Sequence, residues 1–439
     1  MSHPLRSRNA HTNLPIHHTI YKGIIMKKSI GTVTVILFCL VVLPFASPVS
    51  AGEKTSGYAP VINELKVLYD KDAGFRSLVD NALSSAIAPL EGWSPDPNDP
   101  SKLWIWSEKN FGDLLDFFQA WLSFVPGPDN GMMYYELLYG LCYENNNAVR
   151  FVSTEPGLGW TKKFVDARGD FMDSRKSIIK SIMQEWKNYM GNDWYSYQPP
   201  HDTSEGFLGY LTFNEFFTRN LKPGARPVSD TADDAVLCAP SDGLTNIVNE
   251  NLDTDSKIHT KYLEYLNVDQ LLGGSKYANY FLGGTATSTV LLPFNYHHYH
   301  SPAAGSVVEA KNLDTTGGVY FGMAGQFFTY LNNGNVGGYM SDYGVFGVYH
   351  RGYYIIRTKR FGYIAMIPVG LDDISSINFE KKFSPEAVKK GAVSVKKGEK
   401  LGHFAYGGST VILLFEPGVL SGISLNQGAQ LSIITPKKK

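Results

Sequence analysis

The sequence predicts an α+β fold, with a helical N-terminal part followed by a β-rich C-terminal part. Between about residues 60 and 205, apolar residues recur with the 3.6-residue period of amphipathic helices. Beyond residue 205, short apolar or alternating runs are separated by glycines and turn residues, which is typical of strands. The 439 residues are 43% hydrophobic and 18% charged, which is the composition of a chain that folds around a core.

The first 51 residues have the pattern of a secretory leader. Lys27 and Lys28 precede an apolar run, Val33–Leu43, and small residues follow up to Ala51. The run is shorter than the roughly 20 residues that span a bilayer. It begins soon after Met26, where we expect the true start. We therefore expect an exported protein, periplasmic or extracellular, and the alternative is an uncleaved anchor.

Composition excludes several classes of function. The chain has 40 Lys and Arg residues against 41 Asp and Glu residues, so it has no general attraction for nucleic acid. Three cysteines cannot form a disulfide scaffold, and whether Cys142 and Cys238 pair is left open. Beyond the leader, no apolar run approaches membrane length, so that part is expected to be soluble or peripheral to a membrane.

The helical part is expected to end before a proline-containing linker at Tyr195–Thr203. The last long helix is expected to begin at Asp173 or Ser174 and to end at Gly191. The domains predicted from this pattern are a leader at 1–51, a helical domain at 52–205 and a β-rich domain at 206–439. Other expected helices are Val61–Leu68, Phe111–Phe124 and Tyr134–Cys142.

The β-rich part contains several expected strands and one expected hairpin turn. The turn is Lys396–Glu399, placed before a strand at Leu401–Tyr406. The other expected strands are Val236–Cys238, Val290–Pro293, Gly318–Met323, Gly344–Tyr349, Tyr353–Thr358, Gly362–Val369 and Val411–Phe415.

Three histidines lie within four positions, at His297, His298 and His300, in a chain that has only seven beyond residue 51. They could belong to a metal site, but the sequence offers no obvious third ligand and we expect no metal. They could line a solvated strand edge. One of them could also be the base for a serine or cysteine nucleophile.

Two further motifs carry candidate catalytic side chains. Gly407, Gly408 and Ser409 precede the apolar strand Val411–Phe415, and paired glycines allow backbone conformations that other residues do not. The motif lacks the pattern of the α/β-hydrolase elbow and of a phosphate loop. Asp242 lies in a turn and is one candidate to orient a histidine. Each motif is also explained by an ordinary turn.

Together these motifs resemble the phosphatidylserine decarboxylase family. The resemblance covers about residues 206–430, with four motifs in the family's order. The helical part lies outside the minimal enzyme and is similar in placement to members with an extra N-terminal domain, some of which act on free aromatic amino acids. The motifs are Phe216–Pro227, Ala239–Gly243, Tyr296–Pro302, and Lys397–Gly402 leading into Gly407–Thr410.

The resemblance implies an enzyme that cleaves itself between Gly408 and Ser409. Attack by the Ser409 hydroxyl on the Gly408 carbonyl would yield a covalent pyruvoyl group at position 409, so no exogenous cofactor is needed. The pyruvoyl group would act as the electron sink in decarboxylation. The large and small chains would stay associated, because the Val411–Phe415 strand remains in its sheet.

The resemblance also assigns roles to individual residues. His300 matches the family histidine that deprotonates the serine, and Asp242 matches the carboxylate that holds its ring. His297 matches a second histidine, which does acid–base work during decarboxylation. His298 stands where many members have arginine and receives no role. Asn295 stands where many have aspartate, a departure that bears on the surroundings of His297.

The implied reaction converts phosphatidylserine to phosphatidylethanolamine with release of CO2, which makes the protein a carboxy-lyase. A phospholipid substrate implies peripheral membrane contact. The alternative substrate is a free aromatic amino acid such as tryptophan. More distant alternatives are a secreted Ser/His/Asp hydrolase, in which Ser409 stays serine, and an inactive binding protein of the same fold.

Overall fold

The computed structural model describes residues 57–86, 105–131, 133–142, 145–253, 268–313, 351–371, 377–405 and 408–420. The predicted leader and the predicted strands at Gly318–Met323 and Gly344–Tyr349 lie outside these residues. The described chain is helical first and sheet-rich afterwards, which confirms the α+β fold class. Cys142 and Cys238 are free thiols.

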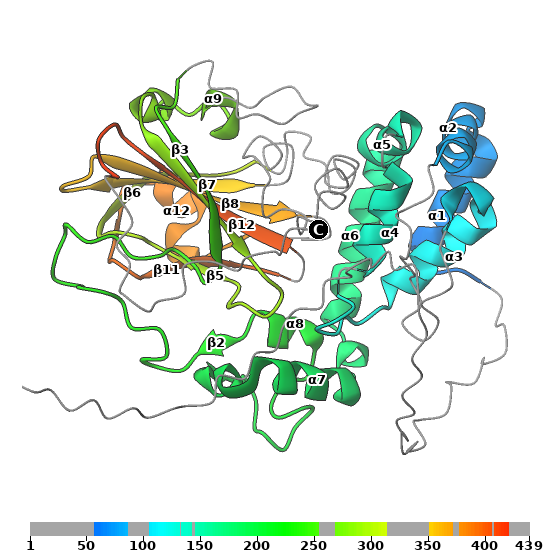
Figure 1. The fold of residues 1–439 in the computed structure, drawn as a ribbon, viewed down its shortest axis with the longest axis horizontal. Coiled ribbons are helices and arrows are strands. Elements are labelled where there is room, and N and C mark those ends of the chain that lie inside the picture. The colour runs from blue at the N-terminus through cyan, green and yellow to red at the C-terminus, as the bar shows by residue number, and fades with distance from the viewer. Residues whose placement is uncertain are drawn as a thin grey trace, which may run out of the picture. The chain divides into compact units, whose positions relative to one another are not determined.

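The described residues of the N-terminal part form α-helices and short 3-10 turns (Figure 1). Its aromatic core includes Trp121, Trp160 and Phe118, all with at most 2% of their surface exposed. Burial of such large side chains stabilises the fold by roughly 2–3 kcal/mol each. The helices are α1 (Pro60–Lys71), α2 (Ala73–Ser84), α3 (Phe111–Leu122), α4 (Met133–Cys142), α5 (Asn146–Ser153), α6 (Gly157–Met172) and α7 (Lys180–Met190), with 3-10 turns η1 (Trp106–Glu108), η2 (Arg175–Ser177) and η3 (Gly191–Ser196).

Helix α7 is shorter than the sequence predicts. It begins at Lys180, and the residues before it form the separate turn η2 instead of a continuous helix. The Ser177 hydroxyl bonds to the carbonyls of Met172 and Ser174 and accepts the backbone N–H of Phe213, so this segment is held in a bend. The predicted end is confirmed, because Gly191 caps the helix with φ of +56°.

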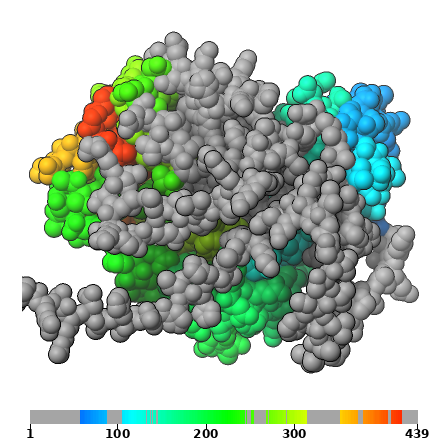
Figure 2. Space-filling view, viewed as in Figure 1, coloured from blue at the N-terminus to red at the C-terminus, as the bar shows by residue number. Residues whose placement is uncertain are grey.

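Residues on both sides of position 205 share one apolar core. Met183, Trp186 and Trp194 pack with Phe213 and Phe216. Helix α7 and the short helix α8 (Phe213–Phe217) are neighbours in Figure 1, and green residues of this region form part of the surface in Figure 2. Strand β1 (Tyr197–Gln198) lies within the stretch predicted to be a linker, and it pairs with β2 (Asn220–Leu221), which follows α8.

The C-terminal part contains two further antiparallel sheets. A seven-stranded sheet has the order β10-β6-β7-β8-β12-β4-β3, and a three-stranded sheet has the order β5-β11-β9. The strands are β3 (Leu244–Glu250), β4 (Thr285–Leu291), β5 (His298–His300), β6 (Gly305–Asn312), β7 (Gly352–Thr358), β8 (Tyr363–Leu371), β9 (Ile377–Phe379), β10 (Val393–Val395), β11 (Lys400–Phe404) and β12 (Gly408–Phe415). The described residues of this part also form short helical segments: α9 (Val268–Leu271), η4 (Ala278–Phe281), η6 (Lys381–Phe383) and α12 (Pro385–Lys389).

Three local predictions in this part differ from the structure. Of the strand predicted at Val290–Pro293, only Val290 and Leu291 belong to β4, which begins at Thr285. Val236–Cys238 is not a strand, and only Cys238 bonds through its backbone N–H to another segment, at Pro302. The turn at Lys396–Glu399 exists, with Gly398 at φ of +74°. However, it does not close a hairpin, because β10 pairs with β6 and β11 pairs with β5 and β9.

Strand β12 lies inside the large sheet, between β4 and β8, and Figure 1 shows it beside β8. Its residues Val411, Leu413 and Phe415 share an apolar core with Tyr299 of β5 and Leu401 of β11. Because side chains alternate along a strand, Ser409 lies on this same face, toward the small sheet. The packing therefore places the predicted nucleophile on the side of the large sheet that faces the histidine-bearing strand.

Candidate active site

Ser409 is the second residue of β12 and is fully buried. It pairs with Leu291 of β4 on one side and with Gly370 of β8 on the other. Within the described residues, its hydroxyl has no hydrogen-bond partner. Burial of an unsatisfied hydroxyl costs about 1–3 kcal/mol, so its presence needs an explanation, and a reacting group is one.

A tight turn connects the end of β4 to His297. Leu291 is the cross-strand neighbour of Ser409, and the turn begins at the next residue. The backbone N–H of Leu292 donates to Oδ1 of Asn295 at 2.7 Å, and the Asn295 N–H donates to the Leu292 carbonyl at 2.8 Å. The side chain of Asn295 thus stabilises the turn that leads from the neighbour of Ser409 to the histidine motif.

His297 is completely buried and is held by two contacts. Its Nδ1–H donates to the carbonyl of Asn295 at 2.9 Å, and its ring stacks on Phe217 at a centroid distance of 3.8 Å. Burial and the nearby charge of Arg219 lower its pKa well below the ordinary value of 6.5. The ring is therefore neutral, and Nε2 carries a lone pair with no hydrogen-bond partner among the described residues.

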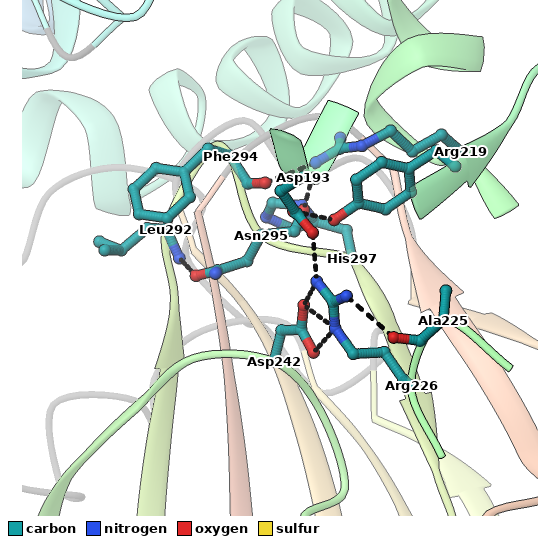
Figure 3. A network of polar contacts seen from close by, with 10 residues as sticks. Asp193, Arg219, Ala225, Arg226, Asp242, Leu292, Phe294, Asn295 and His297 are labelled. Carbon is teal, nitrogen blue, oxygen red and sulfur yellow. Dashed lines mark hydrogen bonds and ion pairs between the residues drawn. The ribbon is translucent and has the colours of Figure 1, made fainter. Parts of the chain in front are cut away.

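Arg219 fixes the backbone on which His297 depends (Figure 3). Its guanidinium donates to the carbonyls of Phe294 and Asn295 and stacks over the ring of Tyr197 at 4.2 Å. The side chain is 2% exposed. A buried arginine on backbone carbonyls is a rigid clamp, because the planar guanidinium presents donors in fixed directions.

His300 has partners at both ring nitrogens. Nδ1–H donates to the carbonyl of Gly398 at 2.8 Å, and Nε2 accepts from the hydroxyl of Tyr296 at 3.2 Å. Burial lowers the pKa of His300 below 6.5, although the bond to Gly398 and the charge of Asp242 act in the opposite direction. His300 is thus a neutral imidazole with its basic nitrogen at Nε2.

Asp242 is paired with an arginine, not with His300. Its carboxylate accepts from Nε and Nη2 of Arg226, at 3.2 and 3.0 Å. Arg226 also binds Oδ1 of Asp193 at 3.0 Å, so one guanidinium lies between two carboxylates (Figure 3). The orienting role expected for Asp242 toward His300 stays a prediction, because both nitrogens of that ring have other partners in this structure.

His298, to which the sequence assigned no role, has structural contacts. Its Nε2–H donates to the carbonyl of Thr218 at 2.9 Å, and its ring stacks on Tyr296 at 4.4 Å. Burial and the charge of Lys400 lower its pKa to about 2, so it is uncharged. His298 joins the histidine strand to the segment that follows α8.

Sequence reasoning missed Arg219, Arg226, Tyr296, Asp193 and Tyr197. The first three lie in motifs that carried the family resemblance, so their position in those motifs was a usable signal. Asp193 and Tyr197 lie upstream of every motif, and no pattern in the sequence marked them. Their contribution is visible only once β1 and β2 are paired.

Comparison with known proteins gives a consistent result. The family model described as phosphatidylserine decarboxylase matches residues 213–433. "Phosphatidylserine decarboxylase proenzyme 3" of Schizosaccharomyces pombe is 33% identical over 213 residues, which are 48% of this chain and 20% of that protein. The proenzyme of Chlamydia trachomatis serovar L2 is 32% identical over 222 residues, which are 51% of this chain and 63% of that protein.

A third relative is covered more fully. The proenzyme of Clostridium perfringens is 30% identical over 257 residues, which are 58% of this chain and 75% of that protein. The chain thus spans a fifth to under two thirds of the Schizosaccharomyces and Chlamydia relatives and three quarters of the Clostridium one. Since the family model covers half of the chain and contains Asp242, His297, His300 and Ser409, the chain belongs to the phosphatidylserine decarboxylase family.

Proposed function

We propose that this chain is a self-processing, pyruvoyl-dependent decarboxylase that converts phosphatidylserine to phosphatidylethanolamine and CO2. The observation that carries the proposal is the buried Ser409 hydroxyl without a partner, directly after Gly408 in a central strand. A structural serine at this position would be expected to bond to a neighbour, whereas a reacting serine need not. The substrate follows the names of the relatives.

Self-processing begins with a shift of the acyl group from nitrogen to oxygen. The Ser409 Oγ attacks the Gly408 carbonyl, its proton passes to a base, and the amide becomes an ester with a free amine on Ser409. Removal of the Ser409 α-proton then breaks the Cβ–Oγ bond, which releases Gly408 as a carboxylate and leaves dehydroalanine. Its tautomer reacts with water and loses ammonia, and the pyruvoyl group remains at position 409.

The histidines supply the proton transfers. His300 takes the hydroxyl proton, because its Nδ1–H is fixed on Gly398 and Nε2 is the basic atom. The negative charge of Asp242 favours the protonated ring and stabilises the imidazolium that forms on His300. His297 performs acid–base work at the reacting carbon through Nε2, since its Nδ1–H is fixed on Asn295. The pyruvoyl group supplies the electron sink for loss of CO2.

The two chains formed by processing should stay together. Residues from Ser409 to Phe415 are hydrogen-bonded to β4 on one side and to β8 on the other. The side chains of Val411 and Ile412 are fully buried, on opposite faces of the sheet. The small chain is therefore held by two backbone ladders and two apolar cores after the covalent bond is broken.

We further propose that the leader at 1–51 exports the protein and that the mature chain meets its lipid at a membrane surface. Among the described helices, none is both long and apolar enough to cross a bilayer. The second candidate substrate is a free aromatic amino acid such as tryptophan. It is favoured by the described helices α1–α7, which precede the family match.

The test is release of labelled CO2 from the protein incubated with carboxyl-labelled phosphatidylserine in anionic vesicles or with carboxyl-labelled tryptophan. We expect release from the lipid, no release from Ser409→Ala, and normal release from Ser306→Ala, a control serine in β6. Release from tryptophan alone would assign the second candidate. A processed protein inactive on both substrates would contradict the proposal.

A further inference from the structure

Two residues that precede the family match contact the two motif arginines. Asp193 belongs to η3 and Tyr197 to β1, whereas the match begins at residue 213. Asp193 Oδ1 binds Nη2 of Arg226 at 3.0 Å, and the ring of Tyr197 lies 4.2 Å below the guanidinium of Arg219. The Tyr197 hydroxyl donates to Oδ2 of Asp193 at 3.0 Å, so the two contacts are joined.

We propose that Asp193 and Tyr197 are positioning residues of the active site, supplied by the chain outside the family's own segment. Asp193 acts through Arg226 on Asp242, and Tyr197 acts through Arg219 on His297. The inference rests on the proposed function, because it is tested by measuring the rates of self-processing and decarboxylation.

Asp193 helps to fix the carboxylate of Asp242, which lies in a turn. Arg226 touches Asp242 through Nε and Nη2, and it shares Nη2 with Asp193. The Arg226 guanidinium bonds to two carboxylates at once, so it cannot turn about its bonds to either one. Asp193 therefore fixes the orientation of the guanidinium that holds Asp242. Burial would raise the pKa of Asp193, but the hydrogen bonds from Arg226 and Tyr197 outweigh this effect and lower the pKa. Asp193 is therefore ionised, as its ion pair with Arg226 requires.

The position of Asp193 is itself well determined. The next residue, Trp194, is 9% exposed and packs in the core with Tyr210 and Phe216. Asp193 therefore projects from a turn that is fixed by a buried indole. It is 38% exposed in the ion pair with Arg226, so its effect should be moderate and not absolute.

Tyr197 acts on the protonation of His297 through Arg219 and the Asn295 carbonyl. Tyr197 is 3% exposed, and pairing of Tyr197 with Leu221 places its ring under Arg219. The ring holds the guanidinium by a cation–π contact while that group donates to the Asn295 carbonyl, which also accepts Nδ1–H of His297. Loss of the ring removes one contact of Arg219 and so weakens its hold on the Asn295 carbonyl, which keeps the proton of His297 on Nδ1.

The experiment follows the full-length chain after a pulse of labelled cell-free translation. Conversion to two chains gives the processing rate, and CO2 release per processed chain gives kcat. Asp193→Asn and Tyr197→Phe should slow processing about fivefold and lower kcat much less, since both weaken the support of Asp242 but keep the aromatic ring under Arg219. Tyr197→Leu should in addition lower kcat about tenfold.

Matched controls separate positioning from loss of fold. Asp202→Asn and Tyr195→Phe change an exposed carboxylate and an exposed ring near the same turn, and both should process at the wild-type rate. Asp193→Glu keeps the charge and should recover more than half of the lost rate. All variants should unfold at temperatures close to the wild-type value, except Tyr197→Leu.

Three results would overturn the inference. One is wild-type processing by Asp193→Asn. Another is an equal fall in processing and kcat in that variant together with a lower unfolding temperature, which would indicate a purely structural role. The third is an unchanged kcat in Tyr197→Leu. A wild-type chain that stays uncut would instead overturn the proposed function, and this inference with it.

Discussion

Individual hydrogen bonds decide which histidine nitrogens can act as bases. In both His297 and His300, Nδ1 faces a backbone carbonyl, which can only accept, so the proton sits on Nδ1. Nε2 is then the basic atom in each ring. Burial lowers both pKa values, so each ring is neutral at pH 7 and ready to take a proton.

The lowered pKa of His300 predicts the pH dependence of processing. A base must be neutral, and protonation of His300 on acidification removes it. Because its pKa lies below the ordinary 6.5, the processing rate should fall on acidification with its half-maximal value below pH 6.5. The processing rate of pulse-labelled chains, measured at a series of pH values, tests this pH dependence. A half-maximal rate at or above pH 6.5 would contradict the neutral, buried environment.

The sequence located the chemical groups of the site but not their partners. Ser409, His297 and His300 could be named from motifs, whereas the pairing of Asp242 with Arg226 could not. The choice between Arg226 and His300 depends on side-chain rotamers, which the spacing of residues does not fix. Likewise, the stacking of Phe217 on His297 joins side chains 80 positions apart and leaves no mark in either local pattern.

Elements were predicted well where periodicity was strong, and poorly where tertiary contacts set their ends. Helices α1, α3 and α4 and strands β7, β8 and β12 lie where the patterns place them. The start of α7 does not, because Ser177 bonds to a distant backbone N–H. The turn at Lys396–Glu399 was correct, but its sequence could not show that the flanking strands join different sheets.

Gly402 should be essential to the small sheet. It is central in β11 and pairs with Tyr299 and Phe379, and an added β-carbon would collide with the Asn378 carbonyl and the Tyr299 hydroxyl. We expect Gly402→Ala to lower the free energy of unfolding by about 2–3 kcal/mol, since backbone and a buried ring must move.

Urea unfolding measures this change, and Gly74→Ala is its control. Gly74 lies in the first turn of α2, where the nearest atom to an added β-carbon is the Asp72 side chain at 3.3 Å. Alanine there should be neutral or should stabilise the helix by up to about 1 kcal/mol. An equal change in the free energy of unfolding for the two substitutions would show that a β-carbon at position 402 causes no steric clash.

At the scale of the whole molecule, the helical part and the β-rich part meet in the polar network around Arg226. Asp193 and Tyr197 contribute to it from upstream of residue 205, and Asp242 and His297 from downstream. The boundary predicted at residue 205 stays a prediction. Because this network joins residues from both sides of residue 205, the two predicted domains need not function independently of each other.

The buried histidines also predict how stability depends on pH. Burial and Lys400 lower the pKa of His403 to about 4, so between that value and 6.5 the unfolded chain binds a proton that the folded chain does not. Stability must then fall as pH falls through this window, by about 1.4 kcal/mol per pH unit for each such histidine.

His403→Gln should remove one such contribution. Urea unfolding at pH 6.5, 5.5 and 4.5 would measure it, and the variant should lose stability less steeply than the wild type by about 1.4 kcal/mol per pH unit. An identical slope in the two proteins would mean that His403 titrates normally in the folded chain.

Self-processing at Ser409 is tested by an intact mass spectrum of the purified protein under denaturing conditions. We predict two chains that break between Gly408 and Ser409, with an N-terminal group on the small chain that gains about two mass units on borohydride reduction of its carbonyl. Ser409→Ala should give a single chain. A single wild-type chain with an unmodified Ser409 would contradict the pyruvoyl enzyme while leaving the fold and its family intact.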